Sequence, residues 1–207
     1  MFRITPVYES FNMVKKNLYE LPLTSAKVYE GRLLHVHRDE VQLPDGKTSV
    51  REYIRHPGAV VVLPLTDSGE LILERQHRYP LGRDFIEVPA GKIDPGEETL
   101  ACAGRELLEE TGYTARDWQY VTTVYPCIGY ADERLVYYLA KGLEYRGHQR
   151  DEDEFLEIFT VPFAEAMEMV RKGEICEVKT VIGLFWLEKL LQGSWSPQSD
   201  PQAQAGA

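Results

Sequence analysis

The chain has 207 residues, which is enough for one domain with a hydrophobic core and a short extension, but too few for two full catalytic domains. Hydrophobic residues make up 43% of the chain and charged residues 27%, a composition that excludes a fibrous or mostly disordered protein. The formal net charge is -10, whereas a protein that binds nucleic acid usually carries a basic surface, so we expect no nucleic-acid partner.

The cysteines Cys102, Cys127 and Cys176 are widely spaced and contain no CxxC pair of the kind found in zinc and redox sites. The first residues lack the apolar core of a signal peptide, and no segment approaches the ~20 apolar residues of a membrane span. We therefore predict a cytoplasmic protein with no membrane partner.

Residues 1–55 contain short β-prone runs separated by turn signals, and they predict a small antiparallel extension. So short a sheet is only marginally stable alone, so it should pack on the remaining chain or on a second subunit. We therefore expect a homodimer. The runs are 26–30, 33–38, 41–43 and 48–55, with the turn 44–46 between the last two.

Residues 56–193 form the predicted main domain, which begins at the break His56-Pro57-Gly58. The alternation of strands and helices predicts an α/β sandwich, with the last two helices covering the sheet. The tail 194–207 is rich in Ser, Pro, Gln and Ala, and we predict that it is disordered. The predicted strands are 59–65, 70–76, 85–89, 118–124 and 134–140, and the predicted helices are 97–111, 162–172 and 178–191.

The first predicted helix has chemically marked ends. Pro95 and Gly96 form a turn before it, and acidic residues follow in the first helical turn, where the helix dipole favours negative charge. Gly112 can end the helix as a C-terminal cap. These signals fix the register of the side chains on the helix.

Three glutamates of this helix, Glu106, Glu109 and Glu110, fall within an arc of about 100°. An apolar face lies beside them, centred on Gly104, where the helix could approach a sheet closely. Its other members are Leu100, Ala101, Ala103, Leu107 and Leu108. Carboxylates this close raise each other's pKa unless a cation compensates them. Hard carboxylate oxygens favour Mg²⁺ or Mn²⁺ over zinc. Seen alone, however, such glutamates more often form a solvated helix face.

The full spacing of the segment 91–113 carries more information than the glutamates alone. It reads Gly91, five residues, Glu97, seven residues, Arg105-Glu106-Leu107, one residue, Glu109-Glu110, one residue, Gly112 and the apolar position Tyr113. Every position of its signature is filled, so this segment resembles the Nudix hydrolases. The resemblance implies a three-layer α/β/α sandwich with a mixed sheet. It also implies hydrolysis of a nucleoside diphosphate linked to another moiety, with a divalent metal.

The resemblance also assigns roles along this segment. Glu106 and Glu110 would be the main metal ligands, Glu109 a further ligand or base, and the carbonyl of Ala90 another ligand. By the helical count Glu97 lies nearly opposite Glu106, which favours a supporting role for Glu97 as a partner of Arg105 or as an outer group. By the same resemblance, Arg105 would support catalysis, and Gly91 and Gly112 would support the backbone of the segment.

Stretches from about residue 26 to 192 narrow the resemblance to the ADP-ribose pyrophosphatase branch. Arg75 and Arg78 end a strand, where guanidinium groups could bind phosphate, although an ordinary exposed strand end is the alternative. Glu87 lies in the active site of this branch, or else forms a strand salt bridge. Arg51 and Arg55 are further candidate substrate contacts, but a surface pairing with a neighbouring glutamate is equally consistent.

Glu133 follows Tyr125-Pro126-Cys127-Ile128-Gly129 in a loop that, by resemblance, closes over the pyrophosphate and supplies the general base. A solvated loop acid is the alternative. In this branch the N-terminal strands often exchange between subunits and help to form the base pocket, which adds support for a homodimer.

These observations predict Mg²⁺-dependent cleavage of ADP-ribose to AMP and ribose 5-phosphate. Mg²⁺ would neutralise phosphate oxygens and lower the pKa of the attacking water, and a carboxylate would accept its proton. GDP-mannose or another nucleotide sugar is an alternative substrate that keeps the same catalytic residues. A non-catalytic Nudix-fold sensor is a third possibility, which the retained glutamates disfavour.

Overall fold

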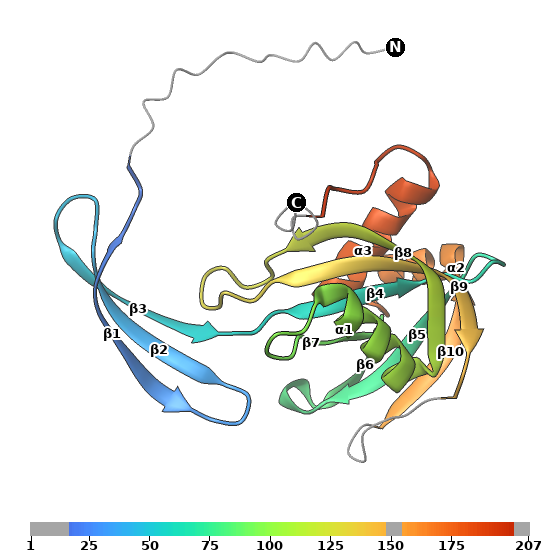
Figure 1. Cartoon of the computed structure of the whole chain (residues 1–207), viewed down its shortest axis with the longest axis horizontal. Helices are drawn as coiled ribbons and strands as arrows, with labels where there is room; N and C mark the ends of the chain where they lie inside the picture. The colour runs from blue at the N-terminus through green and yellow to red at the C-terminus, as the bar shows by residue number, and fades with distance from the viewer. Residues whose placement is uncertain (1–16, 148–154, 201–207) are drawn as a thin grey trace, which may run out of the picture. The chain divides into compact units, whose positions relative to one another are not determined.

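The computed structural model describes residues 17–147 and 155–200. The contacts divide the chain into an N-terminal unit, Met1–Ile54, and a C-terminal unit, Arg55–Ala207 (Figure 1). No helix in the described part of the chain is long and apolar enough to cross a membrane.

The N-terminal unit contains a three-stranded sheet in which β2 (His35–Gln42) lies between β1 (Leu21–Glu30) and β3 (Thr48–Arg55). β1 and β2 are antiparallel, which confirms the predicted extension. Among the described residues of this unit, Val41 is the only buried hydrophobic side chain. The sheet therefore has almost no core of its own.

The C-terminal unit is built around a four-stranded mixed sheet of order β7-β4-β9-β8. β4 (Ala59–Pro64) runs parallel to β9 (Leu135–Tyr145) and antiparallel to β7 (Ala90–Lys92), and β8 (Tyr113–Val124) runs antiparallel to β9. All six residues of β4 are buried, as expected for a continuous apolar run in a central strand.

The two faces of β4 pack against different helices, because successive side chains of a strand point to opposite faces. Val61 and Leu63 belong to the core beneath α3 (Val178–Leu191), whereas Val60 and Val62 belong to the core beneath α1 (Thr99–Glu106). The result is an α/β/α sandwich, which confirms the predicted fold class (Figure 1).

A second sheet has the order β10-β5-β6, and its neighbours are antiparallel. β5 (Glu70–Arg78) lies in the middle, between β6 (Arg83–Glu87) and β10 (Leu156–Pro162), and a short 3-10 turn (Tyr79–Leu81) joins β5 to β6. The helix α2 (Phe163–Lys172) follows β10 directly. This sheet carries Arg75, Arg78 and Glu87, which the sequence predicted to bind substrate.

The carboxylate helix differs from its prediction in two respects. It begins at Thr99, and its last turn, Leu107–Thr111, is a π-helical turn that ends at Gly112 in the left-handed region, with φ of 79°. The predicted apolar face is confirmed at Ala103 and Leu107, which are fully buried, and it is wrong at two other positions. Leu100 is 46% exposed, and a Cβ on Gly104 would meet no atom within 4 Å.

The buried face of this helix also includes Cys102, which lies outside the predicted apolar arc. The cause is β7, whose backbone lies against the helix, so that the carbonyl of Lys92 accepts hydrogen bonds from Arg105 Nη2 and Cys102 Sγ. Glu106 and Glu110 are largely buried, whereas Glu109 is partly exposed.

The first residues of the tail lie against the C-terminal unit. Trp195 packs on Trp186 with ring centroids 4.6 Å apart, and the backbone N–H of Gln198 donates to the carbonyl of Val121. The structure thus describes contacts for residues 194–200, where the sequence predicted disorder, and residues 201–207 lie outside the described residues.

Candidate active site

The site begins where β7 meets the carboxylate helix. A Cβ atom on Gly91 would overlap the carboxylate of Glu106, so the absence of a side chain at Gly91 makes room for this carboxylate. The Glu106 side chain is only 12% exposed. The strand and the helix therefore hold this glutamate in a narrow space.

Glu110 is fixed by the same strand. It is 5% exposed, and its Oε2 accepts a hydrogen bond of 3.0 Å from the backbone N–H of Ala90. Glu110 lies in the π-helical turn, which has a wider hydrogen-bonding pattern than an α-helix and often occurs at functional sites. Two glutamates one turn apart thus converge on Ala90 and Gly91.

Arg105 is the centre of a group of charges that we call the helix cluster, which contains Arg105, Glu97, Glu106 and Glu109. Its guanidinium donates to both oxygens of Glu97, at 2.9 and 3.0 Å. A single nitrogen, Nη1, donates to Glu106 at 2.8 Å and to Glu109 at 2.9 Å. The hydrogen bonds from Arg105 lower the pKa of Glu97 to about 2, and this carboxylate in turn raises the pKa of Arg105.

The donor set fits a hard divalent cation. Glu110 contacts the Ala90 backbone, and Glu106 and Glu109 share Arg105 Nη1. Carboxylate oxygens of this kind suit Mg²⁺ or Mn²⁺. As placed, no three acidic, His or Cys side chains of the described residues form a ready metal cage. Arg105 instead occupies the space between Glu106 and Glu109, so a cation there would replace part of its contacts.

A second group of charges lies on the other sheet, and we call it the buried cluster: Glu74, Arg78, Glu87 and Lys179. Arg78 donates from Nε and Nη2 to the two oxygens of Glu87, at 2.7 and 2.6 Å. Lys179 Nζ donates to the same Glu87 oxygen that Arg78 Nη2 contacts. Burial alone would raise the pKa of Glu87, but the bonds from Arg78 and Lys179 outweigh it, and the pKa is lowered.

Glu74 completes the buried cluster. It is 1% exposed, and within the described part of the chain its Oε2 has no hydrogen-bond partner. Burial raises the pKa of Glu74 to about 7, an effect that the charge of Lys179 opposes and the charge of Glu87 reinforces. Glu110 is also among the neighbours that act on Glu74, so the buried cluster reaches the glutamates of the helix.

Sequence reasoning missed two members of this cluster. Glu74 continues the buried run Leu71–Leu73, and an acidic residue at the end of such a run was the available signal. Lys179 gave no signal at all, because it contacts a residue 92 positions away in the chain.

The predicted loop acid Glu133 lies near His56. Its Oε1 is 3.8 Å from His56 Nδ1, and the Glu133 side chain is 27% exposed. The neighbouring Asp132 accepts hydrogen bonds from the backbone N–H of His56 at 2.8 Å and from Arg55 at 2.9 Å. These contacts tie the loop to the start of the C-terminal unit.

The remaining predicted arginines have partners of their own. Arg75 donates to Glu157 on β10 at 2.7 Å and lies over the ring of Phe159. Arg51 belongs to the N-terminal unit, where it pairs with both oxygens of Glu20. A contact between Arg51 and a substrate therefore stays a prediction.

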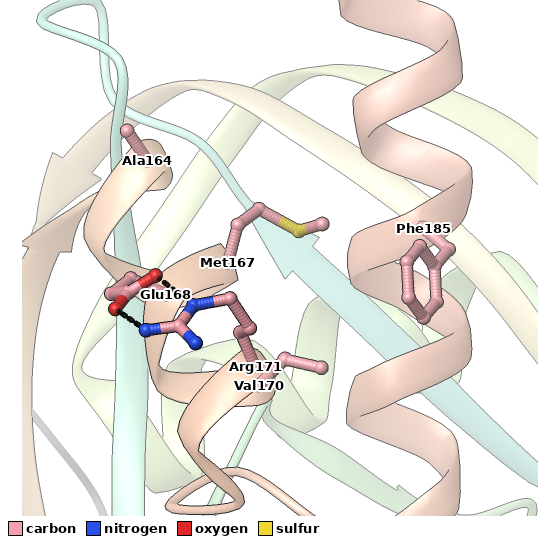
Figure 2. A pocket seen from close by; sticks show the side chains of 6 residues that line it. All are labelled: Ala164, Met167, Glu168, Val170, Arg171 and Phe185. Atoms are coloured by element: carbon pink, nitrogen blue, oxygen red, sulfur yellow. Dashed lines mark hydrogen bonds and ion pairs between the residues drawn. The ribbon is translucent and has the colours of Figure 1, made fainter.

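A hollow of about 410 Å³ lies between α2 and α3, and none of the predicted site residues lines it (Figure 2). Apolar side chains such as Met167 and Phe185 form most of its lining, and an ion pair between Glu168 and Arg171 lies on α2 (Figure 2). The hollow is made by different elements from those that carry the glutamates.

Comparison with known proteins agrees with this geometry. A model of the NUDIX domain matches residues 55–179, which include both charge clusters. The chain belongs to the Nudix family. Residues 22–54 match the N-terminal domain of nucleoside diphosphate sugar hydrolases. The two matches meet where the structure divides the chain.

Individual relatives of this Nudix protein cover most of its length. An ADP-ribose pyrophosphatase of Bacillus subtilis (strain 168) is 40% identical over 84% of this chain and 95% of its own. A methanol dehydrogenase activator of Bacillus methanolicus is 36% identical over 82% of this chain and 92% of its own. The crystal structure of an ADP compounds hydrolase aligns with a TM-score of 0.77 and 27% identity, covering 84% of this chain and 95% of that one.

Nudix hydrolases generally need a divalent metal. The hard oxygen donors of Glu106, Glu109 and Glu110 agree with that requirement. In the structure, Arg105 balances the charges of Glu106 and Glu109.

Proposed function

We propose that this Nudix protein hydrolyses the pyrophosphate bond of ADP-ribose to AMP and ribose 5-phosphate. The observation that carries the proposal is the convergence of Glu106 and Glu110 on the strand residues Ala90 and Gly91. The identity shared with an ADP-ribose pyrophosphatase along most of the chain supports this choice of substrate.

We assign the metal site to the carboxylates of Glu106, Glu109 and Glu110 and the carbonyl of Ala90, with Mg²⁺ as the expected ion and Mn²⁺ as a substitute. The ion supplies neutralisation of the phosphate oxygens and a lower pKa for the attacking water. Arg105 pairs with Glu106 and Glu109 and compensates their charge.

Glu133 is our candidate for the group that accepts the proton of the attacking water. Its carboxylate is partly exposed on a loop, so it can meet substrate. Glu109 is the alternative base. It is the most exposed of the three helix glutamates on the site, with 38% of its side chain accessible.

Arg78 is our candidate for binding the negatively charged pyrophosphate. Its side chain is 43% exposed although one edge of the guanidinium is held by Glu87, so the other edge is available to phosphate oxygens. Both oxygens of Glu87 are engaged and buried, which favours a role in orienting Arg78 over direct contact with substrate. Arg75 and Arg55 are proposed as further phosphate contacts that would exchange their carboxylate partners.

We also propose a homodimer formed through the N-terminal unit. Every residue of β1 is exposed, including Leu21, Leu23, Val28 and Tyr29, and a second subunit would cover such a surface. Light scattering of the full chain at micromolar concentration should give twice the mass of one chain. A cytoplasmic location agrees with three free cysteines.

The test of substrate is product analysis with purified protein and Mg²⁺. The panel is ADP-ribose, GDP-mannose, ADP-glucose, NADH and diadenosine polyphosphates. We expect AMP and ribose 5-phosphate from ADP-ribose as the fastest products. Faster hydrolysis of GDP-mannose would contradict ADP-ribose as the substrate but would leave the assignment of the catalytic site intact. No turnover of any compound would contradict the enzymatic function.

A further inference from the structure

Lys179 is a buried cation in the first turn of α3, a helix that contributes no other charged side chain to the site. It is 8% exposed, and its Nζ contacts Glu87 and, at 3.2 Å, Glu177. Burial of an ammonium group is unfavourable unless the group is paired, and the two carboxylates supply that pairing.

The position of Lys179 is fixed from several directions. Glu177 caps α3 by accepting hydrogen bonds from the backbone N–H groups of Lys179 and Thr180, at 2.8 and 3.0 Å. Thr180 Oγ1 accepts a hydrogen bond from the backbone N–H of Val88, and Tyr137 donates to the carbonyl of Lys179. The helix terminus is thereby docked beside the end of β6, where Glu87 lies.

Glu87 connects Lys179 to Arg78. The carboxylate accepts from Arg78 through both oxygens and from Lys179 through Oε2. Lys179 thereby fixes the rotation of the carboxylate plane, and that plane fixes the guanidinium plane of Arg78. In the described part of the chain, Arg78 Nη1 has no hydrogen-bond partner, so this edge points away from Glu87 and is available to a ligand.

Lys179 also offsets an unfavourable charge. Glu74 and Glu87 are both almost fully buried and lie close enough to interact, and burial opposes their ionisation. Without the lysine, Glu87 would be more readily protonated, and a protonated carboxyl group accepts only weakly from Arg78.

We propose that Lys179 is a positioning residue that acts through Glu87 to hold Arg78 in the orientation that binds the substrate pyrophosphate. This inference rests on the proposed function for the role of Arg78. The lysine affects substrate binding. Without it, Arg78 would move among several rotamers, and the substrate would have to order this side chain on binding, which lowers the affinity.

The test is a double-mutant cycle of Lys179→Met and Arg78→Ala, with KM and kcat for ADP-ribose measured well below the unfolding temperature. We expect Lys179→Met to raise KM roughly tenfold with little change in kcat, as loss of one immobilised side chain predicts. In the Arg78→Ala background the same substitution should leave KM unchanged. An equal rise in KM in both backgrounds would overturn the proposal, as would an unchanged KM in Arg78→Ala alone.

A control variant separates positioning from the loss of a charge on the same helix. Lys189→Met removes a lysine near the other end of α3, where its Nζ contacts Glu188 rather than Glu87. We expect it to leave KM unchanged, and Lys179→Arg to restore KM at least in part. Identical KM values for Lys189→Met and Lys179→Met would overturn the positioning role.

A readout without turnover keeps this test separate from that of the function. Binding of ADP-ribose in EDTA, measured by calorimetry, should weaken roughly tenfold in Lys179→Met and stay unchanged in Lys189→Met. Failure of the wild-type protein to hydrolyse ADP-ribose would count against the proposed function, whereas equal binding by wild type and Lys179→Met would count against the role of Lys179.

Discussion

The helix cluster and the buried cluster both pair glutamates with cations, but they differ in accessibility. In the helix cluster, Arg105 shares one nitrogen between Glu106 and Glu109, and 31% of its side chain is exposed. In the buried cluster, Glu87 is 1% exposed and held by two cations from different elements. The accessible carboxylates of the helix cluster can exchange partners, whereas the buried carboxylate of Glu87 fixes the geometry of its neighbours.

The largest expected effect concerns the exposed loop acid rather than either cluster. Glu133→Gln should lower kcat for ADP-ribose by about 10³, because loss of a general base typically costs 10²–10⁴. The matched control is Glu98→Gln, an exposed glutamate at the helix start without a side-chain capping bond. A kcat for Glu133→Gln equal to that of the control would assign the base to another residue.

Glu87→Gln should reveal the fixed character of the buried cluster. It removes the carboxylate that pairs with Arg78 and one of the two that pair with Lys179, and breaking one partner of a buried pair destabilises a protein by about 3–5 kcal/mol. We expect a fall of about 3 kcal/mol in the free energy of unfolding, measured with urea. A fall below that of Glu98→Gln would mean that the cluster contributes no more than an exposed charge.

Gly91→Ala should affect activity more than stability. The new methyl group would overlap the Glu106 carboxylate, which ends a flexible side chain and can move at little cost. We expect kcat/KM to fall about 10–100-fold, the range seen when groups that orient metal ligands are lost. Gly104→Ala is the control, since its methyl group would meet no atom within 4 Å. Equal activity in both variants would show that Glu106 need not lie against Gly91.

The smallest expected effect is the pH dependence of the Glu97–Arg105 ion pair. The pKa of Glu97 is about 2 in the folded chain against an ordinary value of 4.5, so folding is favoured when Glu97 is ionised. Wild type should exceed Glu97→Gln in unfolding free energy by about 1 kcal/mol above pH 5, the upper range for a partly exposed pair. This difference should shrink as pH falls from 4.5 toward 2. Urea titrations of wild type and Glu97→Gln at pH 6 and pH 3 measure this difference in unfolding free energy. The same difference at both pH values would argue against the ion pair.

The sequence predicted the sandwich because the apolar run of β4 and the helix-ending Gly112 are local signals. It also pointed to Glu97 as a partner of Arg105, and the structure contains that ion pair. The helical count placed Ala103 and Leu107 in the core correctly, but it missed the burial of Cys102, because it does not contain the packing of β7 against that residue.

Other features depend on contacts that no local pattern encodes. Lys179 meets Glu87 only because α3 docks beside the end of β6, through Thr180 and Val88. The contact of Gln198 with Val121 likewise joins a polar tail to a strand far away in the sequence. Such tertiary contacts determine which charged side chains can exchange their partners and which are held in one position.

The most direct test of the account measures the initial rate of AMP formation from ADP-ribose at saturating Mg²⁺ in wild type, Glu110→Gln and Glu98→Gln. Loss of a buried ligand carboxylate should remove several kcal/mol of transition-state stabilisation, so we expect a rate about 10³-fold lower in Glu110→Gln. Glu98→Gln should keep the wild-type rate. Wild-type turnover by Glu110→Gln would contradict the assignment of the helix glutamates as the catalytic metal site.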